Sequence, residues 1–109
     1  MKKEGLQVIL VSEGEELTAT LTGEIDHHTA KEARTAIDTA LFKHRPGRLT
    51  LELGGVDFMD SSGLGLILGR AALCEEMGAR LRLLHPAQRV RRVLAVAGLD
   101  KLREIETEE

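Results

Sequence analysis

The sequence predicts an α/β fold: a single domain in which one mixed, mostly parallel β-sheet packs against helices. Segments with apolar residues at every second position, which indicate strands, alternate with segments whose apolar residues recur three and four apart, which indicate helices. The order along the chain is β-β-α-β-α-β-α-β, and strand–helix–strand units impose parallel pairing with right-handed crossovers. A length of 109 residues suits one domain, so we expect residues 1–109 to share one hydrophobic core.

The first two strands are predicted from alternation of apolar and other side chains. This alternation is present in residues 6–10 and again in residues 17–22, and the turn-like residues 12–15 lie between the two segments. Two short strands in this order indicate a hairpin, which adds an antiparallel edge to the sheet.

The first helix is predicted over residues 29–41, where apolar residues recur three and four apart on one face. Either Asp26 or Thr29 is suited to cap its start. The helix should stop before Arg45 and Pro46, because proline disfavours a helical residue before it.

A third strand is expected over residues 49–53, and apolar residues continue beyond Gly54 and Gly55 to Val56 and Phe58. The second helix should cover residues 64–77. Its sequence is apolar nearly all round, which indicates a buried helix. Gly78 lies where helix ends favour glycine.

The last part of the chain contains one more strand–helix–strand unit. Residues 81–84 form the strand, and Pro86 opens a helix that closes at Gly98. Its expected buried face consists of Val90, Val93, Leu94 and Ala97. Residues 102–105 should form a last short strand, and residues 106–109 a solvated tail.

Composition excludes several classes of function. The 15 basic and 18 acidic residues give a net charge of −3, which argues against direct binding of nucleic acid. Phe42 and Phe58 are the only aromatic residues, so bases would find no stacking platforms and the core must be aliphatic. Cys74 is the only cysteine, which predicts a reducing, cytoplasmic setting without disulfides. We expect neither a membrane span nor a signal peptide, because the apolar stretches are too short.

The first polar cluster is Asp60-Ser61-Ser62-Gly63, between a strand and a helix. The first N–H groups of a helix lack internal partners, so they favour an anion such as a phosphate on Ser61 or Ser62. Gly63 and Gly65 would let another backbone approach closely. The simpler interpretation is that the polar residues only cap the helix. Gly69 extends a loose glycine pattern, but we interpret it as a close-packing position because the P-loop lysine and serine are missing.

The second polar cluster covers residues 23–29, with Asp26 beside His27 and His28. A metal site would need further ligands from His44, His85 or a distant carboxylate, so none is predicted. A hydrolase triad of Ser61, His27 and Asp26 lacks the Gly-x-Ser-x-Gly turn. The simpler interpretation is an exposed loop with a helix cap.

A basic group near the C-terminus is the last feature that sequence singles out: Arg89, Arg91 and Arg92, with Lys101 and Arg103 further on. Such groups are most often solvated helix faces, although a role in docking an acidic partner stays open.

The two polar clusters together resemble one known family. Residues 23–30 (GEIDHHTA), followed by residues 57–70 (DFMDSSGLGLILGR), are similar to the motifs of the anti-sigma factor antagonists, which are STAS domains. The likeness is closest to antagonists of the sporulation anti-sigma F factor and extends through Gly98 and Leu99. It departs at the C-terminus, where the family usually adds a helix that a chain ending at Glu109 is too short to contain.

The resemblance implies a regulatory partner protein rather than an enzyme, with no cofactor and no catalytic residue of its own. The dephosphorylated antagonist binds an ATP-dependent anti-sigma factor, itself a serine kinase, and the sigma factor is released. Phosphorylation of Ser61 ends the binding, and a serine phosphatase restores it. The implied contact residues are Glu24, Asp26, His27, Asp60, Ser62 and Gly63.

Two other classes of function stay open at this stage. One is a STAS scaffold in a pathway without sigma control. The other is a small nucleotide-binding or hydrolytic enzyme, which would need a base or a phosphate-binding lysine near Ser61. No motif in the sequence identifies the sigma factor, the kinase or the phosphatase. No motif indicates the binding affinities or the oligomeric state.

Overall fold

The computed structural model describes residues 5–99 and 105–108, which form a five-stranded sheet. The strands lie in chain order: β1 (Leu6–Glu13), β2 (Glu16–Ile25), β3 (Arg48–Met59), β4 (Arg80–Leu84) and β5 (Ile105–Glu108). The β1–β2 hairpin is antiparallel, and all other neighbours are parallel. The predicted α/β fold class and the antiparallel first edge are confirmed.

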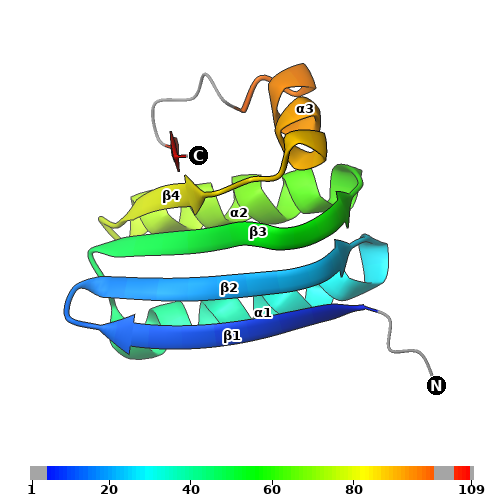
Figure 1. Cartoon of the computed structure of the whole chain (residues 1–109). Coiled ribbons are helices and arrows are strands. Elements are labelled where there is room, and N and C mark those ends of the chain that lie inside the picture. Colours follow the sequence, from blue (N-terminus) through cyan, green and yellow to red (C-terminus); the bar gives the residue numbers. More distant parts are fainter. Residues whose placement is uncertain (1–4, 100–104, 109) are drawn as a thin grey trace.

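Helices α1 (His27–His44) and α2 (Ser61–Glu76) lie behind the sheet in Figure 1, α1 along β1 and β2 and α2 along β3 and β4. They therefore cover the same face, as two right-handed crossovers in one direction require. Helix α3 (Gln88–Val96) follows β4 and packs against β3. No described helix has the length and apolar character that crossing a membrane takes.

The core lies between the sheet and these two helices, and it is aliphatic as predicted. Alternate residues of β2, β3 and β4 point into it and meet one face of α1 and of α2. Its fully buried members include Leu17, Leu21, Ile37, Leu41, Leu49, Leu51, Ile67 and Leu81. Phe42 and Phe58 are 52% and 42% exposed, so neither aromatic ring contributes to the core.

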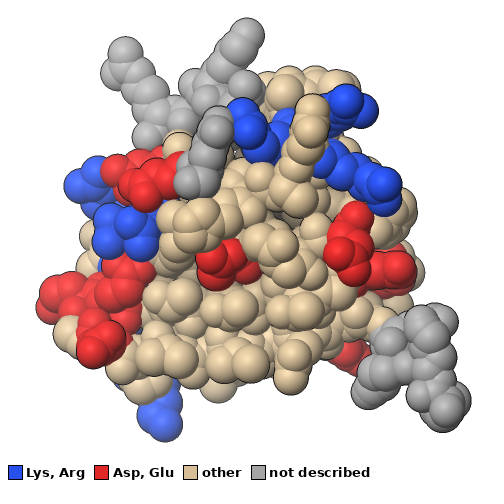
Figure 2. All heavy atoms as spheres, viewed as in Figure 1, with Lys and Arg blue, Asp and Glu red and all other residues tan. Residues whose placement is uncertain are grey.

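The opposite face of the sheet is open. Figure 2 shows few charged side chains at its centre, while charged groups gather near the starts of β2 and β3 and around α3. At the first of these places, Arg48 Nε lies 2.7 Å from Glu16 Oε1 and Thr50 donates a hydrogen bond to Glu16. Arg82 donates a hydrogen bond to Thr50 at 3.1 Å.

Strand β5 corrects the prediction of a solvated tail. Glu106 and Glu108 pair with arginines of the neighbouring strand β4: Arg80 Nη2 lies 3.2 Å from Glu106 Oε2, and Arg82 Nη1 lies 3.7 Å from Glu108 Oε1. These ion pairs let an acidic segment join the sheet parallel to β4. Only the end of the strand predicted for residues 102–105 can be compared, since residues 102–104 lie outside the described part.

Helices α2 and α3 differ from their predictions in detail. Helix α2 begins three residues earlier and is not buried all round, because Leu68 is 44% exposed while the charged Arg70 is 6% exposed. In α3, Val90 and Leu94 are buried as predicted, but Ala97 is exposed. Gly98 follows with a φ of +78°, which confirms its role at the helix end.

Candidate functional site

The two polar clusters lie side by side because β2 and β3 are parallel neighbours. Glu24 pairs with Phe58 and Ile25 with Met59, so both strands end at the same edge of the sheet. The Asp60 N–H donates to the Ile25 carbonyl at 3.2 Å, which joins the two loops directly. Two helices therefore begin next to each other, one at His27 and one at Ser61.

Asp26 caps the first of these helices. Its Oδ1 accepts hydrogen bonds from the N–H groups of His28 and Thr29, both at 2.9 Å. Thr29 Oγ1 accepts from the Asp26 N–H at 2.9 Å and donates to the Glu24 carbonyl at 2.8 Å. The N-cap is therefore Asp26, and Thr29 is the third helical residue of a capping box rather than the cap itself.

These bonds also set the charge of Asp26. The hydrogen bond from the Thr29 N–H is the strongest influence that lowers the pKa of the Asp26 carboxyl, with further help from the Thr29 side chain and the His28 N–H. The carboxylate is thus held ionised at the start of α1, where the helix dipole also favours negative charge.

Asp60 caps the second helix in the same way. Its Oδ1 accepts the Ser62 N–H at 2.7 Å, and its carbonyl accepts the Gly63 N–H at 2.9 Å. Two of the donors that were expected to hold a phosphate are therefore already bonded to Asp60. Ser61, the first residue of α2, is exposed, whereas Ser62 is half-buried.

The glycines of this helix have different roles from those predicted. Gly63 is buried, and a Cβ placed there would lie 2.2 Å from Met59 Cγ. Gly63 is therefore required by packing inside the chain and does not offer its surface to a partner. Gly69, interpreted as a close-packing position, has no atom within 4 Å of such a Cβ, and the same holds for the exposed Gly65.

Several site residues predicted from sequence are brought together with exposed side chains. Glu24, His27 and Ser61 are exposed at this edge of the sheet. Asp57 and Phe58 are exposed beside them, and sequence alone did not give Phe58 a role there. The signal that could have found it is the break in alternation at the end of β3, where an acidic residue and an aromatic residue follow a buried Val56.

The geometry of the described residues supports neither a hydrolase triad nor a metal site. Within residues 5–99 and 105–108, no hydrogen bond joins Ser61 to a histidine, and Asp26 is engaged in its cap rather than with His27. In the same part of the chain, no group of three or more His, Cys, Asp or Glu side chains could hold a metal ion.

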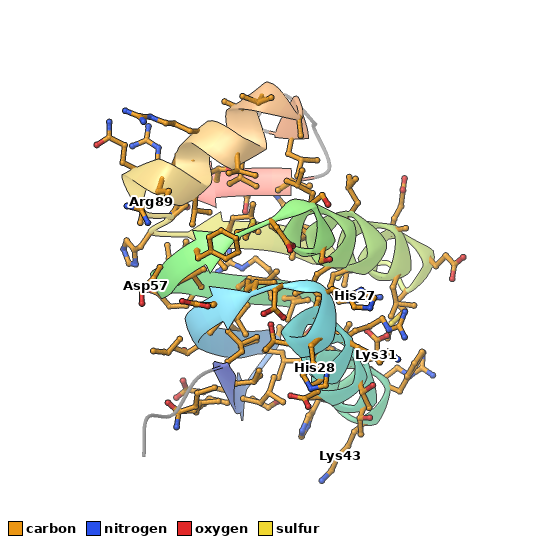
Figure 3. The ribbon with its side chains drawn as sticks, turned by 90° about the vertical axis from the view of Figure 1, so that its right-hand side faces the viewer. His27, His28, Lys31, Lys43, Asp57 and Arg89 are labelled. Carbon is orange, nitrogen blue, oxygen red and sulfur yellow. The ribbon has the colours of Figure 1, made fainter. Side chains whose placement is uncertain are left out.

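The described part of the basic group belongs to one helix. Arg89, Arg91 and Arg92 belong to α3, and Figure 3 shows Arg89 on the same side of the view as Asp57 and on the opposite side from His27 and Lys31. The predicted members Lys101 and Arg103 lie outside the described residues.

Residues 9–104 match the family model described as "Mlab, STAS domain". Because this match spans most of the chain, the chain belongs to the STAS domain family. Within that family its sequence is similar to anti-sigma factor antagonists. The anti-sigma F factor antagonist of Lysinibacillus sphaericus is 39% identical over 85 residues, which make up 78% of this chain and 73% of that protein.

Solved structures agree with this assignment. The anti-sigma factor antagonist SpoIIAA in its unphosphorylated form has a TM-score of 0.77 and 33% identity, covering 94% of this chain and 87% of that one. The Bacillus cell fate determinant SpoIIAA in the phosphorylated form gives 0.70 and 33%, covering 94% and 90%. The predicted family and fold are thereby confirmed.

Proposed function

We propose that this chain is an anti-anti-sigma factor controlled by phosphorylation of Ser61. In the dephosphorylated form it binds an anti-sigma serine kinase that carries ATP or ADP, and the sigma factor is released. A serine phosphatase reverses the modification. The contact surface consists of Glu24, Asp26, His27, Asp60 and Ser62, with Gly63 shaping the loop from inside. A role in transcription also implies a cytoplasmic location.

The observation that carries the proposal is the position of Ser61. Its side chain is exposed at the first residue of α2, at the edge where the Asp26 and Asp60 caps meet. A kinase can reach such a hydroxyl without unfolding the chain. The similarity to a protein that exists in phosphorylated and unphosphorylated forms supports the same mechanism.

Charge explains why one phosphate would switch binding. A phosphoserine carries about −1.5 to −2 charges at neutral pH. A like charge about 4 Å away costs about 4 kcal/mol per pair of unit charges at an effective dielectric near 20. Since each 1.4 kcal/mol is tenfold in affinity, each such pair of unit charges between the phosphate and an acidic group of the partner weakens binding by up to about 10³-fold.

The test is phosphorylation by the cognate anti-sigma kinase with ATP, read by mass spectrometry. We expect one phosphate on the wild type and on Ser62→Ala, and none on Ser61→Ala. Label on Ser62 would refute the site. In binding measurements, Ser61→Ala should bind the kinase as tightly as the wild type, while Ser61→Asp should bind weakly. Equal affinity of these two variants would contradict the charge argument.

A further inference from the structure

A groove of about 380 Å³ runs between α1 and α2 and begins beside Ser62. Gly65 and Gly69, one helical turn apart, leave open space on the α2 side. The α1 side consists of His27, Lys31 and Arg34, again spaced three and four apart. Figure 3 shows His27 and Lys31 on the side of α1 that faces α2, whereas Lys43 points away.

The groove holds more positive than negative charge. Arg70 also lines the groove and is only 6% exposed. Its Nε lies 2.9 Å from Asp38 Oδ1. Among the described residues, no carboxylate lies within 4.0 Å of the Lys31 ammonium or the Arg34 guanidinium. Of the three cations that line the groove, Arg70 is therefore paired with a carboxylate, and Lys31 and Arg34 are not.

Both burial and charged neighbours act on the Arg70 guanidinium. Burial is the main cause that lowers the pKa of the Arg70 guanidinium below its ordinary value, and Arg34 acts in the same direction, while Asp38 opposes them. A second anion in the groove would relieve the repulsion between Arg34 and Arg70. The open space above Gly65 and Gly69 is where such an anion has room.

We propose that this groove is the docking site for an acidic segment of the protein partner, whose carboxylates pair with Lys31 and Arg34. The partner's identity as the anti-sigma kinase rests on the function proposed above. Because the groove begins at Ser62, the segment would lie next to the phosphorylated residue. The contact surface then has an acidic part at Glu24 and Asp26 and a basic part in the groove, which fixes the orientation of the partner.

Charge reversal with a matched control tests the groove. Lys31→Glu and Arg34→Glu should each weaken kinase binding about tenfold or more at low salt, since a lost attraction is replaced by repulsion. Lys43→Glu makes the same change on the same helix outside the groove and should bind like the wild type. If all three variants lose the same amount of kinase affinity, the cause is the change in net charge, and the proposal is wrong. Melting curves check that each variant is folded.

A second measurement needs no kinase. The full chain is titrated with a hexaglutamate peptide while backbone amide shifts are recorded by NMR, with hexalysine and inorganic phosphate in parallel. We expect hexaglutamate to shift the Gly65 and Gly69 amides, in the wild type and in Lys43→Glu but not in Lys31→Glu. Absence of these shifts, or equal shifts with phosphate alone, would overturn docking of an acidic segment.

The two proposals fail in different ways. If the wild type is phosphorylated on Ser61 but the groove variants bind like Lys43→Glu, the groove is wrong and the proposed function stands. If no anti-sigma kinase binds or modifies the wild type while hexaglutamate still fills the groove, the proposed function is wrong and the acidic partner is another protein.

Discussion

Replacing Gly63 by alanine tests the packing on which the serine loop depends. The new Cβ would lie 2.2 Å from Met59 Cγ and 2.8 Å from its Sδ, whereas carbon atoms normally meet at about 3.5–4.0 Å. Met59 is 4% exposed at the end of β3, so its Cγ has no open space to enter. Overpacking of this kind costs about 1–3 kcal/mol.

A smaller gain opposes this cost. Alanine is favoured over glycine within a helix by about 0.5–1 kcal/mol. Because the clash is severe, its cost should lie at about 2–3 kcal/mol, so the net loss for Gly63→Ala is about 1–2.5 kcal/mol, which lowers Tm by roughly 4–20 °C in a domain of about this size. Gly69→Ala is the matched control, because its Cβ meets nothing within 4 Å and only the gain remains. It should raise Tm by roughly 2–8 °C.

Thermal melting followed by circular dichroism, with urea midpoints as a second measure, compares the two variants with the wild type. In a Met59→Ala background, Gly63→Ala should cost little, because the atom it strikes is gone. If Gly63→Ala melts at or above the wild type, or if its cost persists without the Met59 side chain, the packing argument is wrong.

Three further predictions concern single side chains. Asp26→Ala should lower both Tm and kinase affinity because it removes the α1 cap, whereas Asp26→Asn keeps the cap and should lower only the affinity; equal Tm values would contradict the cap. Burial works to raise the pKa of Glu16, but hydrogen bonds from Thr50 and Arg48 lower it overall. A carboxyl with a lowered folded pKa adds stability that is present above its unfolded pKa of about 4.3 and is lost as pH falls through the folded pKa. Glu16→Gln should therefore be less stable than the wild type at pH 7, and urea titrations should show this difference shrinking as the pH falls below about 4.3 and through the lower folded pKa; a constant difference would refute this. Burial raises the pKa of the Cys74 thiol to about 11, so it should react with a thiol reagent only after unfolding, and rapid labelling of the native chain would contradict its burial.

The order of elements could be predicted from sequence because each strand and helix carries its own periodicity. The extension of the last strand to residue 108 could not be predicted, since Glu106 and Glu108 have the composition of a solvated tail. Their pairing with Arg80 and Arg82 is a contact between segments more than twenty residues apart. Ion pairs across strands leave no local pattern in the sequence.

The candidate site, too, could be predicted from sequence only in part. The family resemblance implied one contact surface that includes Asp26 and Ser61. The structure places both residues at one edge of the sheet, where the parallel strands β2 and β3 end. The groove between α1 and α2 could not be predicted, because the spacing of glycines in the sequence does not show which atoms each glycine faces. Gly63 and Gly69 lie in the same helix, yet one touches Met59 and the other borders open space.

Under the proposed function, the structure also bears on how a phosphate on Ser61 would act. Helix N-termini attract anions, but here the Asp26 and Asp60 carboxylates already accept the N–H groups that follow them. A phosphate therefore adds to two existing negative charges. Within the part of the chain that the structure describes, Lys31 and Arg34, in the groove that begins beside Ser62, have no carboxylate within 4.0 Å. Under both proposals, phosphorylation repels acidic groups of the partner at the loop and competes for the same cations that its acidic segment would use, so one modification weakens both parts of the contact surface.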